Sequence, residues 1–140
     1  MIRKFEIDEL ETVMKIWLAT NIEAHNFIDE RYWQRNYDSV KEMLPNATIF
    51  IYEDNNAIQG FIGLIGNYIA GIFINSNSQS KGIGKALLDY VKENHSKLSL
   101  QVYRKNVRAV KFYIRENFIV LKEQIDESTG EIELVMDWTK

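Results

Sequence analysis

The residues with the clearest potential for chemistry form a polar loop that contains Gln79-x-x-Gly82-x-Gly84. The loop follows a segment expected to be a strand and runs directly into a predicted amphipathic helix. The first turn of a helix has backbone N–H groups without partners and the positive end of the helix dipole, and glycine lets a ligand approach the backbone closely. The loop is therefore predicted to bind phosphate groups, with Lys81 and Lys85 adding positive charge at its rim.

Two familiar phosphate-binding motifs do not fit this loop. A Walker loop would have glycine in place of Gln79 and serine or threonine in place of Ala86. A dinucleotide-binding fingerprint would have glycine in place of Leu87. A purely structural turn with two glycines stays open as an alternative to a ligand site.

A second candidate pattern, Asn106-x-x-Ala109-x-x-Phe112-Tyr113, follows about twenty residues later, after another predicted strand. Asn106 directly precedes a predicted helix, where an asparagine side chain can cap the first turn. The Tyr113 phenol has an ordinary pKa of about 10, so it is protonated at neutral pH and can donate a proton. The alternative for a tyrosine in such a helix is packing in the core.

Together the two patterns resemble the signature motifs of the GNAT superfamily, the GCN5-related N-acetyltransferases. The first is similar to the family's acyl-CoA-binding motif, Arg/Gln-x-x-Gly-x-Gly/Ala, and the second to its Asn-x-x-Ala-x-x-Phe-Tyr motif. The predicted order of strands and helices agrees with the family over essentially all 140 residues. The resemblance implies an acetyl-CoA-dependent N-acetyltransferase that moves the acetyl group directly to a primary amine, Tyr113 acting as general acid on the leaving thiolate.

The resemblance also implies which residues hold the cosubstrate. Asn106 would donate a hydrogen bond to the pantetheine arm, and the main chain before the glycine loop, at Ile72, Phe73 and Ile74, would run along that arm. The residues whose backbone amides would bind the pyrophosphate are Gln79, Ser80, Lys81, Gly82, Ile83, Gly84 and Lys85.

The chain departs from the family pattern at a few positions. The family often has proline at the position of Ser76 and arginine or glycine at that of Ser80. It commonly has Leu-Gly-Phe where this chain has Glu116-Asn117-Phe118. Asparagine tolerates the left-handed backbone conformation that glycine usually supplies at a helix end, so we expect the turn at Asn117 to be kept.

The sequence offers two candidates for the general base, and neither lies on the predicted strand 68–74. Many family members use a glutamate on a central strand, but the predicted strand 68–74 has no carboxylate. His25 is the best candidate for a base or for part of the acceptor site, because imidazole titrates in the useful pH range, and Glu23 is a second. An ordinary loop histidine is the alternative. His95 has no predicted role, and two histidines without any cysteine argue against a metal site.

Aromatic residues near His25 are candidates for the walls of an acceptor pocket, and they are Phe27, Trp33 and Tyr103. They could equally belong to the core. Within the family, His25-x-Phe27-Ile28 followed by Tyr32-Trp33 resembles a small group of bacterial acetyltransferases. Residues 1–70 contain 6 Lys/Arg against 11 Asp/Glu, a net charge of −5, which favours a cationic acceptor such as a protein lysine or a small amine.

The elements that must position these residues follow from hydrophobic periodicity. A capping box, Asp8-x-x-Glu11, predicts the first helix, and the turn residues 54–57 predict a hairpin between the strands beside them. The fold class is a mixed α/β domain of the GNAT type, with a mostly antiparallel sheet and flanking helices. The predicted strands are 2–7, 48–53, 58–65, 68–74, 98–103, 118–125 and 132–138. One predicted helix begins at Asp8 and another at Ile83, and two more span 29–43 and 107–116.

Composition limits the classes of protein that the chain could be. With 140 residues, 46% hydrophobic, 26% charged and no cysteine, it is expected to be one cytoplasmic domain, 1–140, monomeric or homodimeric, without disulfides. No apolar run reaches the roughly 18 residues of a membrane helix, and no secretory signal is expected. Residues 81–122 contain ten basic and three acidic residues, which suits a small anionic ligand.

Two other functions stay open at this point. A non-catalytic acyl-CoA-binding module would explain the missing strand carboxylate. A nucleic-acid binder could use the basic region 81–122, but the chain has no recognisable reading motif and its pI of about 5.4 argues against that class.

Overall fold

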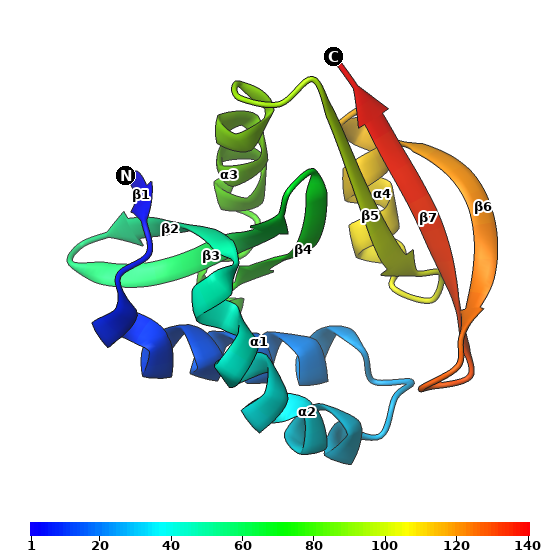
Figure 1. Ribbon diagram of the computed structural model, residues 1–140, viewed down its shortest axis with the longest axis horizontal. Coiled ribbons are helices and arrows are strands. Elements are labelled where there is room, and N and C mark those ends of the chain that lie inside the picture. Colours follow the sequence, from blue (N-terminus) through cyan, green and yellow to red (C-terminus); the bar gives the residue numbers. More distant parts are fainter.

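Seven segments rich in β-branched and aromatic residues form one sheet in the computed structural model, which describes residues 1–140 (Figure 1). The strand order is β1-β2-β3-β4-β5-β7-β6, and β4–β5 is the one parallel pair. The predicted mixed α/β fold is confirmed. The strands are β1 (Ile2–Lys4), β2 (Thr48–Asp54), β3 (Ala57–Ile65), β4 (Tyr68–Ile74), β5 (Lys97–Tyr103), β6 (Ile119–Asp126) and β7 (Glu131–Thr139).

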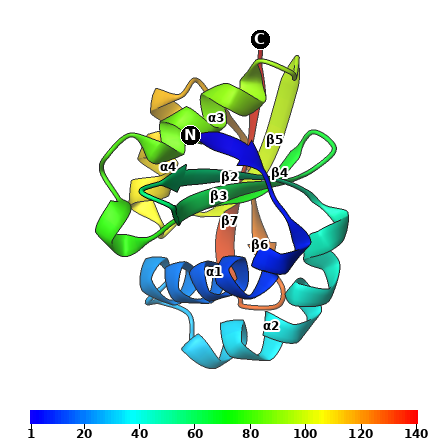
Figure 2. The same ribbon diagram turned by 90° about the vertical axis from the view of Figure 1, so that its left-hand side faces the viewer.

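Four helices cover the sheet on both faces: α1 (Leu10–Ala24), α2 (Glu30–Met43), α3 (Ile83–Lys92) and α4 (Val107–Arg115). Figure 2 shows α1 and α2 on one side of the sheet and α3 on the other. None of these helices has the length and apolar character needed to cross a membrane.

The alternation of side chains along β3 separates two hydrophobic cores. Phe61 packs in a cluster with α1 and α2, whereas Ile62, one residue later, packs with α3, β5 and β7. A strand directs successive side chains to opposite faces, so a continuous apolar run such as that of β3 serves both cores. The helical stripe predicted for α3 is buried at Ile83, Leu87 and Val91.

The turn predicted between β2 and β3 has the geometry of a tight hairpin. Asn55 and Asn56 both have positive φ angles, 54° and 60°, and Asp54 pairs with Ala57. Two left-handed residues in a two-residue loop match the right-handed twist of the flanking strands. The predicted hairpin is therefore confirmed.

The first helix begins differently from the prediction. β1 has only 3 residues, and a 3₁₀ turn follows it. The capping box expected from Asp8 and Glu11 is wrong, because the Glu9 carboxylate takes that role and accepts the Glu6 N–H at 2.9 Å. α1 starts one residue after Glu9.

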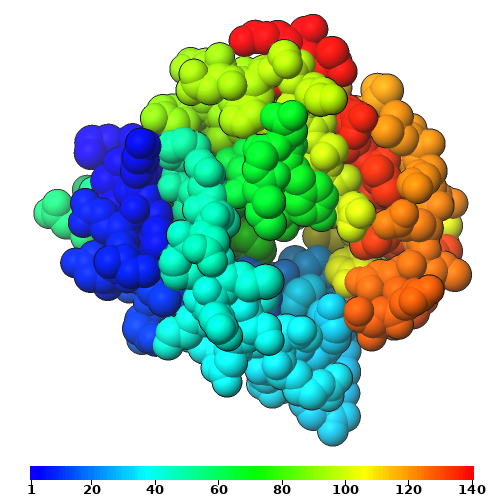
Figure 3. Space-filling model, viewed as in Figure 1, coloured from blue at the N-terminus to red at the C-terminus, as the bar shows by residue number.

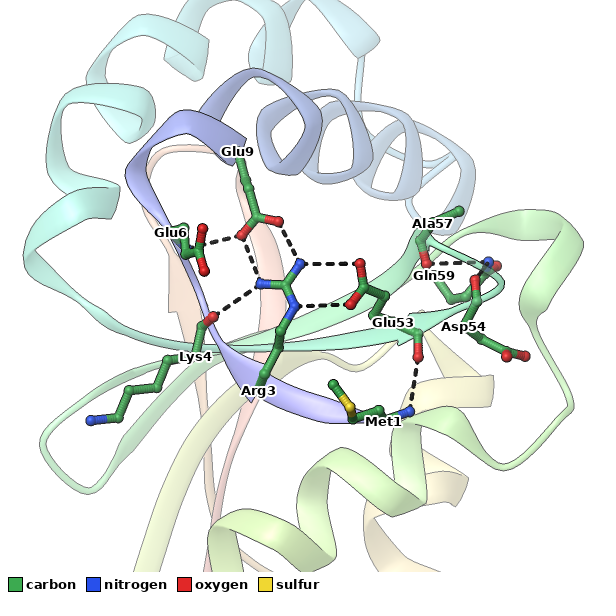
Figure 4. Close-up of polar contacts among 9 residues, drawn as sticks. All are labelled: Met1, Arg3, Lys4, Glu6, Glu9, Glu53, Asp54, Ala57 and Gln59. Atoms are coloured by element: carbon green, nitrogen blue, oxygen red, sulfur yellow. Dashed lines mark hydrogen bonds and ion pairs between the residues drawn. The ribbon is translucent and has the colours of Figure 1, made fainter.

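A second partner explains why Glu9 is held at this place. The Arg3 guanidinium lies between Glu9, at 2.5 Å, and Glu53, at 3.1 Å (Figure 4). These carboxylates raise the pKa of Arg3, and its hydrogen bonds lower the pKa of Glu9. The contacts join β1, β2 and the start of α1 across about fifty residues of chain.

The parallel strands β4 and β5 diverge soon after they meet. They pair only at Tyr68–Ser99 and Ile69–Leu100. Beyond that point β4 still pairs with β3 through Ile74, but it has no strand on its other side. The main chain at the end of β4 is thus left with a free edge in the middle of the sheet, where a ligand can replace the missing strand.

Candidate active site

A cavity of about 900 Å³ lies where β4 and β5 separate. Figure 3 shows the surface hollowed between the segments of β4, α1 and β5. The cavity is lined by the end of α1 and the residues after it, the end of β4, the glycine loop and α4. Of the predicted site residues it brings together His25, Phe27, Ile72, Phe73, Ile74, Gln79, Ser80, Gly82, Ile83, Gly84, Lys85, Asn106 and Tyr113.

The two glycines of the loop have different reasons to be glycine. Gly82 precedes α3 with a φ of +79°, a left-handed conformation that disfavours side chains. Gly84 has no such constraint, and a Cβ there would meet the Phe112 ring at 3.6 Å and Ile72 at 3.9 Å, which is ordinary contact. Packing within the protein therefore does not require glycine at position 84, whereas a phosphate that approached the backbone closely would.

Hydrogen bonds fix the start of this loop to the β2–β3 hairpin. The Asn75 amide donates to the Ile58 carbonyl at 3.1 Å, and the buried Ser78 hydroxyl donates to the Gln59 side chain. The Gln79 amide donates to the Ile74 carbonyl at 3.1 Å. The loop thus has a defined position relative to the free edge of β4.

The two lysines expected at the rim are placed differently. Lys85 lines the cavity but forms ion pairs with Asp89 at 3.1 Å and Glu116 at 3.2 Å, and these contacts raise its pKa. Lys81 is exposed and does not line the cavity. Carboxylates therefore compensate the charge of Lys85, and the charge of Lys81 lies outside the cavity.

Both ends of α4 have the predicted geometry. The Asn106 Oδ1 accepts the Ala109 N–H at 3.3 Å and caps the helix. At the other end Asn117 has a φ of +72°, and the Phe118 N–H donates to the Tyr113 carbonyl at 3.0 Å. Asparagine thus provides the left-handed C-terminal turn, as expected from the sequence.

Tyr113 is buried, with 7% of its surface exposed, between the rings of Phe112 and Phe118. Its hydroxyl has no hydrogen bond within the protein. The only side-chain polar atom that is both fully buried and without a partner is Trp33 Nε1, so the Tyr113 hydroxyl is not fully buried. The Tyr113 hydroxyl is therefore accessible from the cavity that the residue lines. Burial raises the pKa of Tyr113, so the hydroxyl stays protonated at neutral pH.

His25 directly follows α1, and its side chain meets that of Asn106 at the wall of the cavity. Its Nδ1 lies 2.9 Å from the Asn21 carbonyl oxygen, and its Nε2 lies 3.4 Å from the Asn106 Nδ2. Because a carbonyl only accepts, Nδ1 carries the proton, and the Nε2 lone pair faces the Asn106 amide donor. Burial lowers the pKa of His25, so the ring is neutral at pH 7, and the second candidate base, Glu23, lines the same cavity.

The aromatic residues predicted as acceptor walls surround His25, but they do not all reach the cavity. The imidazole stacks on the Trp33 ring, with 5.0 Å between ring centroids. It packs edge to face with Phe27 and Tyr103, at centroid distances of 5.7 Å and 5.3 Å. Phe27 lines the cavity, whereas Trp33 is in the core and Tyr103 donates its hydroxyl to Asp126 at 2.5 Å. Trp33 and Tyr103 thus pack against the His25 ring without lining the cavity.

Three contributors to the site were missed by sequence reasoning. Asn21 precedes His25 by one helical turn, a spacing that could have indicated their contact. Lys105 places its ammonium over the Phe27 ring at 5.7 Å, and Arg108 reaches the glycine loop. The last two lie beside or inside the Asn106–Tyr113 pattern, but only the fold shows what they contact.

Comparisons with known proteins agree with this geometry. The model of the acetyltransferase (GNAT) domain family matches residues 19–138. The peptidyl-lysine N-acetyltransferase YiaC of Escherichia coli strain K12 is 31% identical over 140 residues, which cover 99% of this chain and 96% of that protein. The peptidyl-lysine N-acetyltransferase YjaB of Salmonella typhimurium is 27% identical, over 90% of this chain and 88% of that protein.

Solved structures share the fold over the whole chain. The apo form of Escherichia coli YjaB has a TM-score of 0.86 at 24% identity, covering 99% of this chain and 96% of its own. The PaiA N-acetyltransferase of Thermoplasma acidophilum, solved in complex with coenzyme A, has a TM-score of 0.85 at 22% identity, covering 100% and 98%. The chain belongs to the GNAT acetyltransferase family, and it is an N-acetyltransferase.

Proposed function

We propose that this enzyme transfers the acetyl group of acetyl-CoA directly to a primary amine, with the lysine side chain of a protein as the acceptor. The observation that carries the proposal is the single cavity that joins the free edge of β4, the glycine loop, Tyr113 and His25. A binding function alone would not need a protonated phenol and a neutral imidazole in the same cavity.

The residues around the cavity fit acetyl-CoA, which supplies the activated thioester carbonyl when it is bound. The edge of β4 at Ile72, Phe73 and Ile74 that faces away from β3 would hold the extended pantetheine arm, and Asn106 would donate a hydrogen bond to it. The loop amides from Gln79 to Lys85 would hold the pyrophosphate. The glycine at position 84, which internal packing does not require, supports this assignment.

Two side chains perform the proton transfers in this proposal. The His25 Nε2 lone pair takes a proton from the amine as the new nitrogen–carbon bond forms. The Tyr113 hydroxyl gives its proton to the sulfur as the carbon–sulfur bond breaks. The chain has no cysteine, so no thiol of the protein can carry the acetyl group in between.

A protein lysine is the favoured acceptor for two reasons. The relatives YiaC and YjaB are named peptidyl-lysine N-acetyltransferases. The excess of five negative charges in residues 1–70, among which Glu23 lines the cavity, favours a cationic side chain.

The test is incubation with acetyl-CoA and a set of lysine peptides, small amines and polyamines. We expect free thiol to appear only when an acceptor is present, and mass spectrometry to find the acetyl group on a lysine amine. Binding of acetyl-CoA without thiol release with any acceptor would favour the non-catalytic binding module instead. Thiol release with small amines alone would contradict the lysine assignment.

A further inference from the structure

Arg108 joins the two sequence motifs of the site through its side chain. It is the second residue of α4 and donates to Gln79 Oε1 at 2.7 Å and to Ser80 Oγ at 2.9 Å. All three residues line the cavity. The guanidinium therefore lies at the start of the glycine loop, 28 residues away along the chain from Ser80.

The charge of Arg108 is not compensated by the protein. Both of its partners are neutral oxygen acceptors, and it takes part in none of the ion pairs of the structure. Lys85, on the same wall of the cavity, has two carboxylate partners instead. Arg108 is thus the cation that is both fixed on the loop and free to attract an anion.

The geometry of the guanidinium also leaves donors available. Arginine has five N–H groups in a planar fork, and the Gln79 and Ser80 contacts use two of them. Ser80 itself has a φ of +64°, a left-handed conformation that a non-glycine residue keeps only when its surroundings hold it. The contact with Arg108 is one of those restraints, so the arginine and the loop backbone are presented together.

We propose that Arg108 binds the diphosphate of coenzyme A and adds to the loop amides the positive charge that Lys85 cannot fully supply. This proposal rests on the proposed function, because it takes the glycine loop as the cofactor site. Phosphate oxygens accept charge-assisted hydrogen bonds from guanidinium, and the planar fork can serve two oxygens at once.

Calorimetric titration with coenzyme A and with dephospho-coenzyme A, which keeps the diphosphate but lacks the 3′-phosphate, tests the assignment. Arg108→Gln removes the charge but keeps a hydrogen-bonding side chain. We expect the variant to have about ten-fold lower affinity for both ligands than wild type. This difference in affinity should become smaller as the salt concentration rises. Lys111→Gln removes an exposed charge from the same helix outside the cavity and should bind both ligands as wild type does.

Two further variants separate charge from loop positioning. Arg108→Lys keeps the charge and should bind more tightly than Arg108→Gln, whereas Ser80→Ala removes one loop contact and should lose less affinity than Arg108→Gln. Equal losses in Ser80→Ala and Arg108→Gln would mean that the arginine only positions the loop, and would overturn the proposal. A loss confined to coenzyme A would place the guanidinium at the 3′-phosphate and overturn the diphosphate assignment.

The outcomes also distinguish this proposal from the proposed function. If wild type binds both ligands and Arg108→Gln binds them equally well, the role of Arg108 is wrong while the cofactor site stands. If folded wild-type protein binds neither ligand, the cofactor site itself is wrong. Thermal unfolding of each variant shows whether a lost affinity reflects a lost fold.

Discussion

Burial favours the neutral form of both Tyr113 and His25, and it therefore shifts their pKa values in opposite directions. It raises the pKa of the Tyr113 phenol and lowers the pKa of the His25 imidazole. At neutral pH the cavity therefore holds one protonated donor and one unprotonated acceptor. That combination is what acyl transfer to an amine requires, because one proton leaves the amine and one joins the leaving sulfur.

Tyr113→Phe removes a hydroxyl that has no partner in the protein, so we expect the variant to fold normally. Turnover should fall about a hundredfold, while affinity for coenzyme A changes by less than about two-fold. Steady-state kinetics beside calorimetric titration measures both. Tyr90→Phe, which removes a hydroxyl outside the cavity, is the matched control. Wild-type turnover in folded Tyr113→Phe would exclude the general-acid role.

His25→Gln tests the base through pH dependence. The contacts of the imidazole are the rings of Phe27, Trp33 and Tyr103 and two amide groups, with no carboxylate. Desolvation places its pKa below 6.5, so activity should persist until the pH falls below that value and then decline as the ring gains a proton. His25→Gln should lower the rate about a hundredfold and abolish this acid limb.

His95→Gln is the control for that pH profile, since His95 lies outside the cavity. An unchanged acid limb in His25→Gln would assign the base to another group, with Glu23 the next to test.

The pH dependence of folding stability gives a second test of the His25 pKa. The unfolded chain protonates His25 more readily than the folded one, so the folded state loses stability as pH falls below 6.5, and less so in His25→Gln.

At the level of the elements, the start of α3 combines a backbone requirement with a ligand requirement. Gly82 has a left-handed φ of +79°, but Gly84 is the second residue of the helix and has no such constraint, and alanine is a better helix former than glycine. The helix is therefore less stable than its sequence could make it. The proposed approach of a cofactor to the backbone would account for glycine at this position.

Gly84→Ala is expected to be at least as stable as wild type in thermal unfolding, because its Cβ meets only ordinary contacts. Affinity for coenzyme A should fall about ten-fold or more, since the methyl group takes space in the cavity. Gly63→Ala adds a methyl group in open space outside the cavity and should leave binding unchanged. Tight binding by Gly84→Ala would contradict the close approach.

Local patterns predicted the elements well, and their limits are physical. The asparagines of the β2–β3 turn and Asn117 were identified because a left-handed backbone selects a few residue types. The capping box was misplaced because Glu9 is held by Arg3, a contact that helical spacing does not reveal. A cap signal is local, but the competing partner belongs to another element.

Across the whole molecule, the site depends on contacts between distant parts of the chain. His25 and Asn106 are 81 residues apart, and they meet because β4 and β5 diverge and leave a cavity between α1 and α4. The residues of the two GNAT-like motifs line one part of this cavity, which is the part proposed to hold the cofactor. The motifs did not predict that Trp33 and Tyr103 would stand behind His25, because aromatic periodicity indicates burial without indicating which neighbour is contacted.

The proposed mechanism depends on acetyl-CoA binding in the cavity between the glycine loop and α4. We would test this by calorimetric titration of the purified protein with acetyl-CoA, beside coenzyme A and ATP. We expect micromolar binding of acetyl-CoA and coenzyme A, with no comparable binding of ATP, which has phosphates but lacks the pantetheine arm that β4 would hold. A folded protein that binds no acetyl-CoA, or binds ATP equally well, would contradict it.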